Sequence, residues 1–356
     1  MRGGEKCLEA LLELYPGSPV FTLFYEEAKV SETIRRHPVY SSRLQKFPKA
    51  LSHYRYYLPF FPAAVESFEV GEYDLVISLS HCVAKGVKKR KDSLHICYCF
   101  TPMRYAWVSF DDTFGRRNIF LKTAARWVIE GLKKWDLESN RRVDHFIAIS
   151  NHVKNRIRDV YKRDAAVVYP PVDTDFYTPD PKKAAEDFYL VVSALVPYKK
   201  IELAVEAFNR LGKRLVVIGG GPEMGGLQRK AQSNIQFLGW QTDEVLRDYY
   251  RRARALIFPG EEDFGIVPLE AQACGCPVIA FGKGGALETV IQGRTGVFFN
   301  EVSSDSLAEA VLYFEKQKFT PQEARAHAVR FGRERFKSEM KTEIDRLSAS
   351  GRGGGA

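Results

Sequence analysis

The chain has 356 residues, 45% of them hydrophobic and 27% charged, which is an ordinary composition for a globular protein. This length exceeds one typical hydrophobic core and predicts two domains. The net charge of +9 favours anionic partners, such as nucleotide phosphates or anionic lipid. No basic recognition module accompanies that charge, so we expect no nucleic-acid partner.

No apolar run approaches the ~18 residues of a membrane-spanning helix, and we expect neither such a helix nor a signal peptide. The cysteines are scattered without C-x-x-C spacing, and most have apolar neighbours. We therefore predict a cytoplasmic protein whose cysteines are reduced core thiols. They are Cys7, Cys82, Cys97, Cys99, Cys274 and Cys276.

The first half of the chain begins with an unusual pattern. Gly3 and Gly4 predict a turn ahead of a helical run at residues 7–14. In a nucleotide-binding βαβ unit such a turn follows a strand. None precedes it here, so either the domain begins with a turn or, as we expect, its first strand is missing. Near-continuous apolar runs then predict parallel strands buried on both faces, at residues 20–24, 74–78, 95–99 and 145–150.

A long basic amphipathic helix is predicted at residues 116–137. Trp127, Leu132 and Trp135 lie there among lysines and arginines. Two interpretations stay open. The helix packs on the sheet in the ordinary way, or its apolar face contacts an anionic membrane surface.

Consecutive prolines at Pro170 and Pro171 predict a hinge, because they stop a helix and stiffen a linker. Residues 1–170 would form one doubly wound α/β domain and residues 171–331 a second. We expect a charged helix at residues 332–347 to pack back on the first domain, and residues 348–356 to form a disordered tail.

The second half repeats the alternation of apolar strands and helical runs. Strands are predicted at residues 188–193, 214–219, 235–239, 255–259, 277–281 and 296–299. Helices are predicted at residues 201–210, 243–252, 269–274 and 306–316. Two such domains joined by a hinge predict a cleft between them.

The most informative stretch is Glu262-Asp-Phe-Gly-Ile-Val-Pro-Leu-Glu270, which joins a predicted strand to a predicted helix. Such loops are where α/β sheets bind ligands. Its two carboxylates can accept hydrogen bonds from sugar or ribose hydroxyls, and the N–H groups of the helix start can face a phosphate. This layout predicts a nucleotide-sugar site.

Further candidate ligands follow neighbouring strands. Lys199 and Lys200 lie between a strand and a helix, where an ammonium group can neutralise a departing diphosphate. Gly220 is the middle of three glycines after the next strand, although glycines there can simply form a tight turn. The loop at residues 282–288 also follows a strand, and its N–H groups can cradle a pyrophosphate.

The stretch at residues 258–273, with Gly284-Gly-Ala-Leu-Glu and Gly293-Arg-Thr-Gly, resembles glycosyltransferase family four. That family has the GT-B fold, in which two Rossmann-like domains face a cleft. The segments Ser80-His-Cys-Val-Ala-Lys-Gly and Thr101-Pro-Met-Arg-Tyr-Ala-Trp resemble a bacterial subgroup that includes O-antigen mannosyltransferases. The likeness covers nearly the whole chain.

The resemblance implies retaining transfer of a sugar from a nucleotide-sugar, without a required metal or other cofactor. The matching positions assign Glu262 to the donor sugar and Glu270 to the ribose hydroxyls. The amides of Phe264, Gly265 and Ile266 would face the sugar and phosphates. Lys199 would hold the diphosphate.

The first domain would bind the acceptor, a saccharide or a polyprenyl-diphosphate-linked saccharide. The resemblance places His81 near the reacting sugar and brings Gly3 and Gly4 to the diphosphate. Arg104 would face an acceptor or donor phosphate. Mannose from GDP-mannose is the donor that the subgroup suggests, for the synthesis of a cell-surface polysaccharide at the inner face of the cytoplasmic membrane.

The sequence departs from the family pattern at two further places. Ala194 stands where an arginine is frequent, and Phe100 where the subgroup commonly has histidine. A UDP-sugar donor and a non-catalytic sugar-nucleotide-binding relative therefore stay open as alternatives.

A nicotinamide-dependent oxidoreductase would need G-x-G-x-x-G spacing, which the glycines lack. Asp173 and Asp175 have the form of a metal-binding D-x-D motif, but we interpret them as linker or helix cap.

Overall fold

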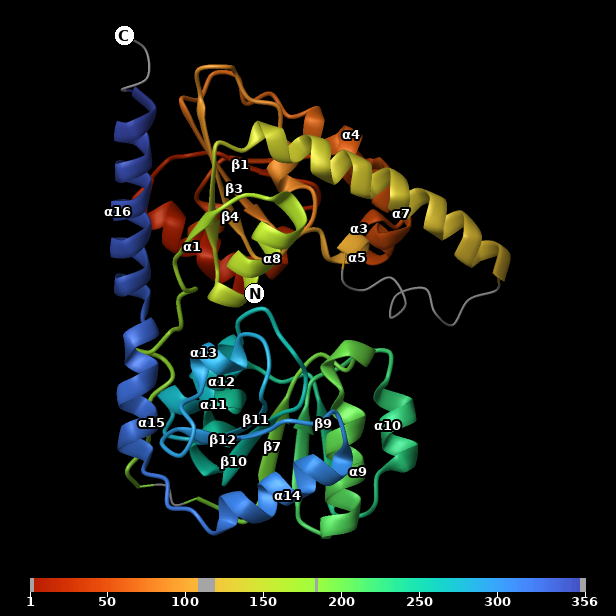
Figure 1. Cartoon of the computed structure of the whole chain (residues 1–356), viewed down its shortest axis with the longest axis vertical. Helices are drawn as coiled ribbons and strands as arrows, with labels where there is room; N and C mark the ends of the chain where they lie inside the picture. The colour runs from red at the N-terminus through yellow and green to blue at the C-terminus, as the bar shows by residue number, and fades with distance from the viewer. Residues whose placement is uncertain (1–2, 108–118, 183–184, 353–356) are drawn as a thin grey trace. The chain divides into compact units, whose positions relative to one another are not determined.

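The computed structural model describes residues 3–107, 119–182 and 185–352 (Figure 1). The chain divides into two compact units. Unit 1 consists of Met1–Pro170 together with Phe336–Ala356, and unit 2 of Pro171–Arg335. The division falls between the two prolines of the predicted hinge, and the C-terminal segment from Phe336 belongs to unit 1.

Unit 1 alternates short strands with helices and 3-10 turns. Its elements are α1 (Gly3–Leu14), β1 (Val20–Thr22), η1 (Glu27–Lys29), α2 (Glu32–Arg35), β2 (Val39–Ser41), η2 (Arg43–Lys46), α3 (Ala50–His53), η3 (Tyr54–Phe60), α4 (Phe61–Glu66), β3 (Leu75–Ser80), η4 (Ala84–Gly86), β4 (Leu94–Cys99), α5 (Arg104–Trp107), α7 (Ile119–Ser139), η5 (Asn140–Arg142), β5 (His145–Ala148), α8 (Asn151–Tyr161), β6 (Ala165–Val167) and, from Phe336 onward, α16 (Arg333–Arg352).

The strands of unit 1 form two parallel sheets. The larger has the order β3-β4-β5-β6, and β1 pairs only with β2 in a separate two-stranded sheet. The prediction that residues 20–24 form a strand buried on both faces is therefore wrong, because β1 is only half-buried. Phe21 of β1 packs its ring against Phe68 and Tyr73, at 5.5 and 6.1 Å between ring centroids. These contacts connect the small sheet to the chain that leads into β3.

Helices cover the larger sheet of unit 1. Ile129 and Leu132 of α7 are buried in a cluster with Phe61 and Val65 of α4, so the described part of α7 packs into the core through its apolar face. Residues 116–118 of the predicted basic helix lie outside the described residues. On α16, Phe336 packs against Tyr98 of β4 with 5.7 Å between ring centroids.

Unit 2 follows a regular strand–helix alternation. Its elements are β7 (Tyr189–Val192), η6 (Pro197–Lys199), α9 (Ile201–Leu211), β8 (Leu215–Ile218), α10 (Met224–Lys230), β9 (Ile235–Gly239), α11 (Asp243–Arg252), β10 (Ala255–Phe258), α12 (Ile266–Ala273), β11 (Val278–Phe281), α13 (Ala286–Thr289), β12 (Gly296–Phe299), α14 (Ser304–Glu315), α15 (Pro321–Ala328) and η7 (Val329–Phe331).

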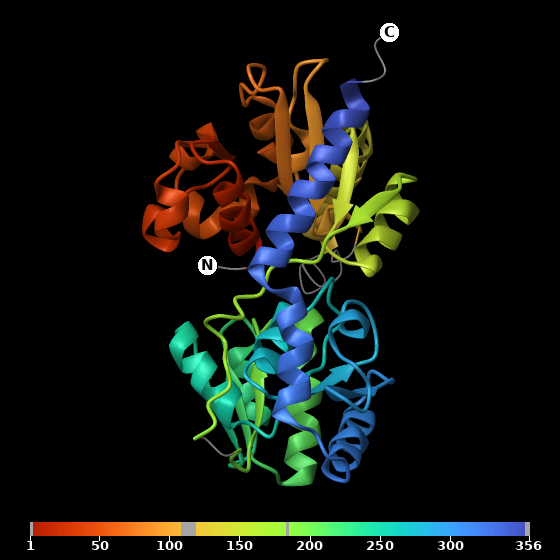
Figure 2. The same cartoon turned by 90° about the vertical axis from the view of Figure 1, so that its left-hand side faces the viewer.

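All strands of unit 2 pair in parallel, in the order β12-β11-β10-β7-β8-β9. Side chains alternate between the two faces along each strand, so Val191 joins the cluster under α9, α10 and α14, while Leu190 joins the cluster under α11, α12, α13 and α15. Burial on both faces explains why the sequences of these strands are apolar throughout. Figures 1 and 2 show the two helical layers.

The two ends of the chain differ from the prediction. Gly3 and Gly4 belong to the first turn of α1 rather than to a turn ahead of it. At the other end, α16 continues to Arg352, beyond the predicted boundary at residue 347. Of the predicted tail, residues 353–356 lie outside the described part of the chain.

Candidate functional site

The sheet of unit 2 has one topological switch point, between β7 and β10. The chain proceeds outward from β7 to β8 and β9, and then returns to β10 on the other side of β7. The loops that leave β7 and β10 therefore diverge at the carboxyl edge of the sheet, where doubly wound folds bind ligands. Lys199 follows β7 and Glu262 follows β10, so the two predicted residues lie on the two loops that flank this point.

Lys199 and Glu262 form an ion pair in which Nζ of the lysine donates to Oε1 of the glutamate. Their side chains are 15% and 23% exposed, so water reaches the pair at the edge of the sheet. Lys200, the next residue, is exposed and starts α9 in the left-handed conformation, with φ of 54°. The structure thus brings together the lysine and carboxylate that the sequence assigned to the donor diphosphate and donor sugar.

The loop after β10 is held by backbone hydrogen bonds. The N–H group of Gly285 donates to the carbonyl oxygen of Glu262 at 2.7 Å. Gly265 is the N-cap residue of α12 and has φ of +98°, a conformation that favours glycine. Because Gly265 has no side chain, the first N–H groups of α12 have no side-chain cap from the N-cap residue. Phe264 is buried and Ile266, the first residue of α12, is half-buried.

Glu270 lies inside the first turns of α12 and is 7% exposed. The hydroxyl of Tyr250, on α11, donates to its Oε2 at 3.3 Å. Burial, and then the charge of Glu270, raises the pKa of Tyr250, so this hydroxyl stays protonated and donates. Sequence reasoning missed Tyr250, because only the packing of α11 on α12 brings it there.

The glycines after β8 have two different environments. A Cβ atom on Gly219 would lie 1.8 Å from the carbonyl oxygen of Ser193, and one on Gly221 would lie 2.3 Å from that of Leu195. These two glycines are required for the loop to pack on the backbone that follows β7. Apart from Gly220 itself and its two neighbours in the chain, no described residue has a heavy atom within 4 Å of the Cβ position of Gly220, so this position faces open space.

The predicted residues of unit 1 also gather at a carboxyl edge. His81 follows β3 and is exposed, while Phe100 follows β4 and Arg104 starts α5. The N–H group of Arg104 donates to the carbonyl oxygen of His81 at 3.5 Å. A Cβ atom on Gly4 would lie 3.7 Å from the Phe100 ring, so the start of α1 lies against the end of β4.

A buried charge network that the sequence did not reveal lies beneath this edge. Lys85 of η4 is 1% exposed and forms an ion pair with Asp136 of α7 at 3.0 Å. Its Nζ also donates to the hydroxyl of Ser139 at 2.8 Å. The second carboxylate oxygen of Asp136 accepts from Nε1 of Trp107 at 2.8 Å and from the hydroxyl of Tyr161 at 2.9 Å.

This network fixes the two loops of the unit 1 edge from below. Lys85 lies four residues after His81, and Trp107 lies three residues after Arg104. Both are bound to the same carboxylate, that of Asp136. Burial, followed by the charge of Asp136, raises the pKa of Tyr161, which therefore stays a donor.

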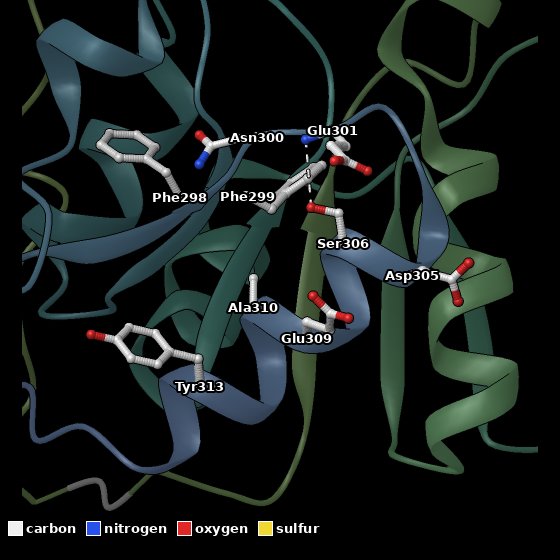
Figure 3. A pocket seen from close by; sticks show the side chains of 9 residues that line it. All are labelled: Phe298, Phe299, Asn300, Glu301, Asp305, Ser306, Glu309, Ala310 and Tyr313. Atoms are coloured by element: carbon white, nitrogen blue, oxygen red, sulfur yellow. Dashed lines mark hydrogen bonds between the residues drawn. The ribbon is translucent and has the colours of Figure 1, made fainter.

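A pocket of about 500 Å³ opens elsewhere in unit 2, between the end of β12 and α14 (Figure 3). None of the predicted site residues lines it. Its lining includes the carboxylates of Glu301, Asp305 and Glu309 and no lysine or arginine. This charge disfavours a diphosphate, so the pocket is no alternative donor site.

The remaining sequence candidates have structural roles. All six cysteines are buried and none forms a disulfide, as predicted. Burial raises the pKa of Cys82 and of Cys274 to about 12, which suppresses their thiolates. Asp173 accepts a hydrogen bond from the N–H group of Phe176 at 3.0 Å and so caps a turn. Within the described ranges, no helix is long and apolar enough to span a bilayer.

Two family models match successive parts of the chain. The model described as Glycosyltransferase Family 4 matches residues 20–176, and the model described as Glycosyl transferases group 1 matches residues 175–335. Together they cover the larger part of unit 1 and all of the unit 2 sheet.

Curated relatives match part of their own length. A GDP-mannose-dependent alpha-(1-6)-phosphatidylinositol monomannoside mannosyltransferase of Mycolicibacterium smegmatis is 33% identical over 193 residues, which are 46% of this chain and 50% of that protein. A D-inositol 3-phosphate glycosyltransferase of Gordonia bronchialis is 30% identical over 243 residues, which are 58% of this chain and 53% of that protein. The chain thus spans about half the length of the curated relatives it matches.

Solved structures match over nearly the whole chain. HepE from Anabaena, crystallised with UDP and glucose, covers 97% of this chain and 96% of its own, with a TM-score of 0.69 and 17% identity. Sucrose-phosphate synthase from Thermosynechococcus elongatus covers 96% of this chain and 92% of its own, with a TM-score of 0.70 and 20% identity. At such identities the likeness establishes the fold. The matched family models and this shared architecture confirm the resemblance seen in the motifs: the chain belongs to glycosyltransferase family 4 and has the GT-B fold.

Proposed function

We propose that the chain is a retaining glycosyltransferase that transfers mannose from GDP-mannose to a saccharide or lipid-linked saccharide acceptor. The observation that carries this proposal is the meeting of Lys199 and Glu262 at the switch point of unit 2, beside the uncapped start of α12. The mannosyltransferase of Mycolicibacterium smegmatis supports the choice of donor, since its name specifies GDP-mannose.

Each group in unit 2 has a distinct chemical task in the proposed reaction. The ammonium of Lys199 and the N–H groups of Gly265 and Ile266 stabilise the negative charge that develops on the departing diphosphate. Glu262 accepts hydrogen bonds from hydroxyls of the donor sugar. Glu270, whose Oε2 accepts a hydrogen bond from Tyr250, binds the ribose hydroxyls through its carboxylate. Gly220 lets a ligand approach the backbone without a steric clash.

The acceptor half of the proposal rests on unit 1. His81 is exposed at the end of β3, and we assign it to the reacting sugar. The guanidinium of Arg104 suits a phosphate of the acceptor or donor, because it donates in a planar fork. Gly3 and Gly4, at the start of α1, provide N–H groups for the diphosphate. The proposed reaction requires no metal ion or other cofactor.

A lipid-linked acceptor places the proposed reaction at the inner face of the cytoplasmic membrane. The net charge of +9 supports contact with anionic lipid. The basic helix predicted at residues 116–137 is one candidate for that contact. Its described part exposes Trp127 by 78% but buries Ile129 and Leu132 in the core.

A panel of nucleotide-sugars tests the donor. GDP-mannose is expected to raise the melting temperature, since it binds the folded state, and GDP is expected to be released when a polyprenyl-diphosphate-linked saccharide is added. Release should persist in the presence of a chelator. If a UDP-sugar gives both signals and GDP-mannose neither, the donor assignment is wrong. If GDP-mannose stabilises the protein but no acceptor of the panel elicits release, the chain is a sugar-nucleotide-binding relative.

A further inference from the structure

A second feature of unit 1 lies outside the proposed donor and acceptor residues. Residues 43–60, which form η2, α3 and η3, expose several large apolar side chains. We call this surface the aromatic shelf. Its exposed apolar residues are Phe47, Leu51, Tyr56 and Phe60, with Tyr56 exposed by 66%. Figure 2 shows the segment, in red to orange, at one side of the larger sheet of unit 1.

The aromatic shelf is also strongly basic. No aspartate or glutamate occurs between Glu32 and Glu66. The exposed cations of the shelf are Arg43, Lys46, Lys49 and Arg55. In the part of the chain that the structure describes, Arg43, Lys46 and Lys49 have no carboxylate partner, so their positive charge is directed to the solvent.

The exposed rings are held in place rather than collapsed onto the core. Below them, Leu44, Leu58 and Phe61 are buried and anchor the segment. Phe47 packs edge-on against Tyr57 with 5.4 Å between ring centroids, and the hydroxyl of Tyr57 donates to a backbone carbonyl oxygen in the same segment at 2.7 Å. The fold thus presents these apolar groups to the solvent on a fixed support, a feature that marks interaction surfaces.

We propose that the aromatic shelf docks on an anionic phospholipid bilayer. The Tyr56 side chain suits the headgroup region, where its apolar ring and its polar hydroxyl are both accommodated. The Phe47 and Phe60 rings are apolar groups of the kind that insert at the boundary between headgroups and acyl chains. Lysines beside them are attracted to lipid phosphates and anionic headgroups. The charge complementarity is the argument for this partner, because three cations without a carboxylate partner among the described residues belong to the same exposed segment as the apolar side chains.

The aromatic shelf is better suited to this contact than α7. The apolar residues Ile129 and Leu132 of α7 are buried in the core, and Nε1 of Trp135 donates to Glu66 at 2.7 Å. The described part of α7 also carries the acidic residues Glu130 and Glu138. The inference concerns attachment alone and does not depend on which sugar is transferred.

Vesicle sedimentation tests the proposal. The full chain is expected to sediment with vesicles of phosphatidylcholine and phosphatidylglycerol in equal parts, and to stay in solution with phosphatidylcholine alone. Each lysine near an anionic surface contributes about a fivefold factor in binding, so Lys46→Gln with Lys49→Gln should weaken binding roughly 30-fold. Leu51→Ser with Tyr56→Ser should weaken it on the same vesicles by removing the inserted apolar groups.

Matched controls separate the aromatic shelf from net charge and from α7. Lys316→Gln with Lys318→Gln removes the same charge from two exposed lysines of unit 2 and should leave vesicle binding unchanged. All variants alter exposed side chains, and far-UV circular dichroism verifies their folding. The proposal is overturned if the wild-type chain does not bind the anionic vesicles at low salt. It is also overturned if the control variant loses as much binding as the shelf variant, or if Trp127→Ser alone abolishes binding.

The shelf variants also distinguish this proposal from the proposed reaction. They should retain the thermal stabilisation by a nucleotide-sugar, because the shelf residues are not among the donor ligands. Loss of vesicle binding with retained donor stabilisation supports the docking role. Loss of donor stabilisation together with vesicle binding would indicate that the aromatic shelf supports the fold of unit 1 instead, and would count against the docking role.

Discussion

Two lysine–carboxylate pairs of the same chemistry serve the two units in opposite ways. In unit 1, Lys85 and Asp136 are buried and share further hydrogen bonds with three other side chains. In unit 2, Lys199 and Glu262 meet at a water-exposed edge. A buried pair fixes the loops that it connects, since breaking it leaves an uncompensated charge. A pair that water reaches can separate at a lower cost than a buried one, and can then bind a ligand instead.

The same contrast extends to the surroundings of each pair. In unit 2, Lys199 and Glu262 lie on the two loops that flank the switch point, at the carboxyl edge of the sheet. In unit 1 the buried pair belongs to a polar network inside the unit, while the surface at residues 43–60 is aromatic and basic. Under the two proposals above, unit 2 binds a small polar ligand, and unit 1 contacts a larger surface that is both apolar and anionic.

The largest expected effect comes from breaking the buried pair. Lys85→Met removes the cation but keeps a side chain of similar length, which leaves the Asp136 carboxylate buried with only neutral donors. We expect a loss of about 3–5 kcal/mol in the free energy of unfolding of unit 1. The measurement is denaturant unfolding followed by tryptophan fluorescence in a Trp240→Phe background. Three of the four tryptophans then remain, all in unit 1.

A matched control for this prediction lies on the same segment. Lys88 pairs with Glu66 at 3.0 Å, but its side chain is 58% exposed. Lys88→Met should change the unfolding free energy by less than about 1 kcal/mol. Equal losses of unfolding free energy in the two variants would show that burial does not determine how much the Lys85 pair stabilises unit 1. The contrast drawn between the two units would then be wrong.

The second prediction concerns the exposed pair of unit 2. Under the proposed function, Lys199→Met should lower turnover by roughly 10²–10³-fold, because an ammonium that stabilises the leaving diphosphate is lost. Stability should change less than in Lys85→Met, since water reaches this pair. The measurement is nucleotide release with the donor identified in the panel, together with thermal unfolding.

Lys213 provides the control for Lys199. It pairs with Glu315 at 2.9 Å, and it precedes β8, so it lies at the amino edge of the same sheet. Lys213→Met removes a comparable lysine–glutamate pair away from the carboxyl edge and should leave turnover unchanged. If both variants lose turnover alike, the effect arises from the fold of unit 2 and not from the proposed site.

The third prediction concerns the pH dependence of the stability of unit 1. His95 of β4 is buried between Ser78, which contacts Nε2 at 2.8 Å, and the carbonyl oxygen of Arg142, which contacts Nδ1 at 3.0 Å. Both contacts suit the neutral ring with its proton on Nδ1. Burial lowers the pKa of His95 from 6.5 to about 4, although nearby Asp144 acts in the opposite direction.

The sign follows from proton uptake. Between about pH 6.5 and pH 4 the unfolded chain protonates His95 while the folded chain does not, so stability falls as the pH is lowered through this window. The shift corresponds to roughly 3 kcal/mol. In the tryptophan background above, unit 1 should lose this stability on acidification, and His95→Gln should flatten that dependence. An unchanged pH profile in His95→Gln would assign the acid sensitivity to other groups.

Much of unit 2 could be predicted from the sequence. Its strands are buried on both faces, so β8 (Leu215–Ile218) and β11 (Val278–Phe281) lie inside predicted apolar runs. The strands β2 (Val39–Ser41) and β6 (Ala165–Val167) were missed, because three residues give too short a pattern. The separate pairing of β1 with β2 could not be predicted either, since apolar runs do not specify strand order.

The candidate site shows the same limit. Lys199 and Glu262 could be placed together from sequence, because both follow strands that end at one edge of a parallel sheet. Lys85 and Asp136 are 51 residues apart, and neither belongs to a recognisable motif for an ion pair. One signal was present: Lys85 lies between Ala84 and Gly86 in an otherwise apolar run. A lysine in such a setting needs a partner when the segment is buried.

The ion pair at the switch point has a consequence for which anions can enter. Lys199 is already paired with the carboxylate of Glu262. An incoming anion must therefore displace Glu262 before it can bind the ammonium group of Lys199. Under the proposed function, free phosphate gains little from this exchange, because it leaves Glu262 without a partner. A nucleotide-sugar supplies hydroxyls to the displaced carboxylate and a ribose to Glu270. Glu262 would thereby weaken the binding of small anions, such as free phosphate, relative to that of a nucleotide-sugar.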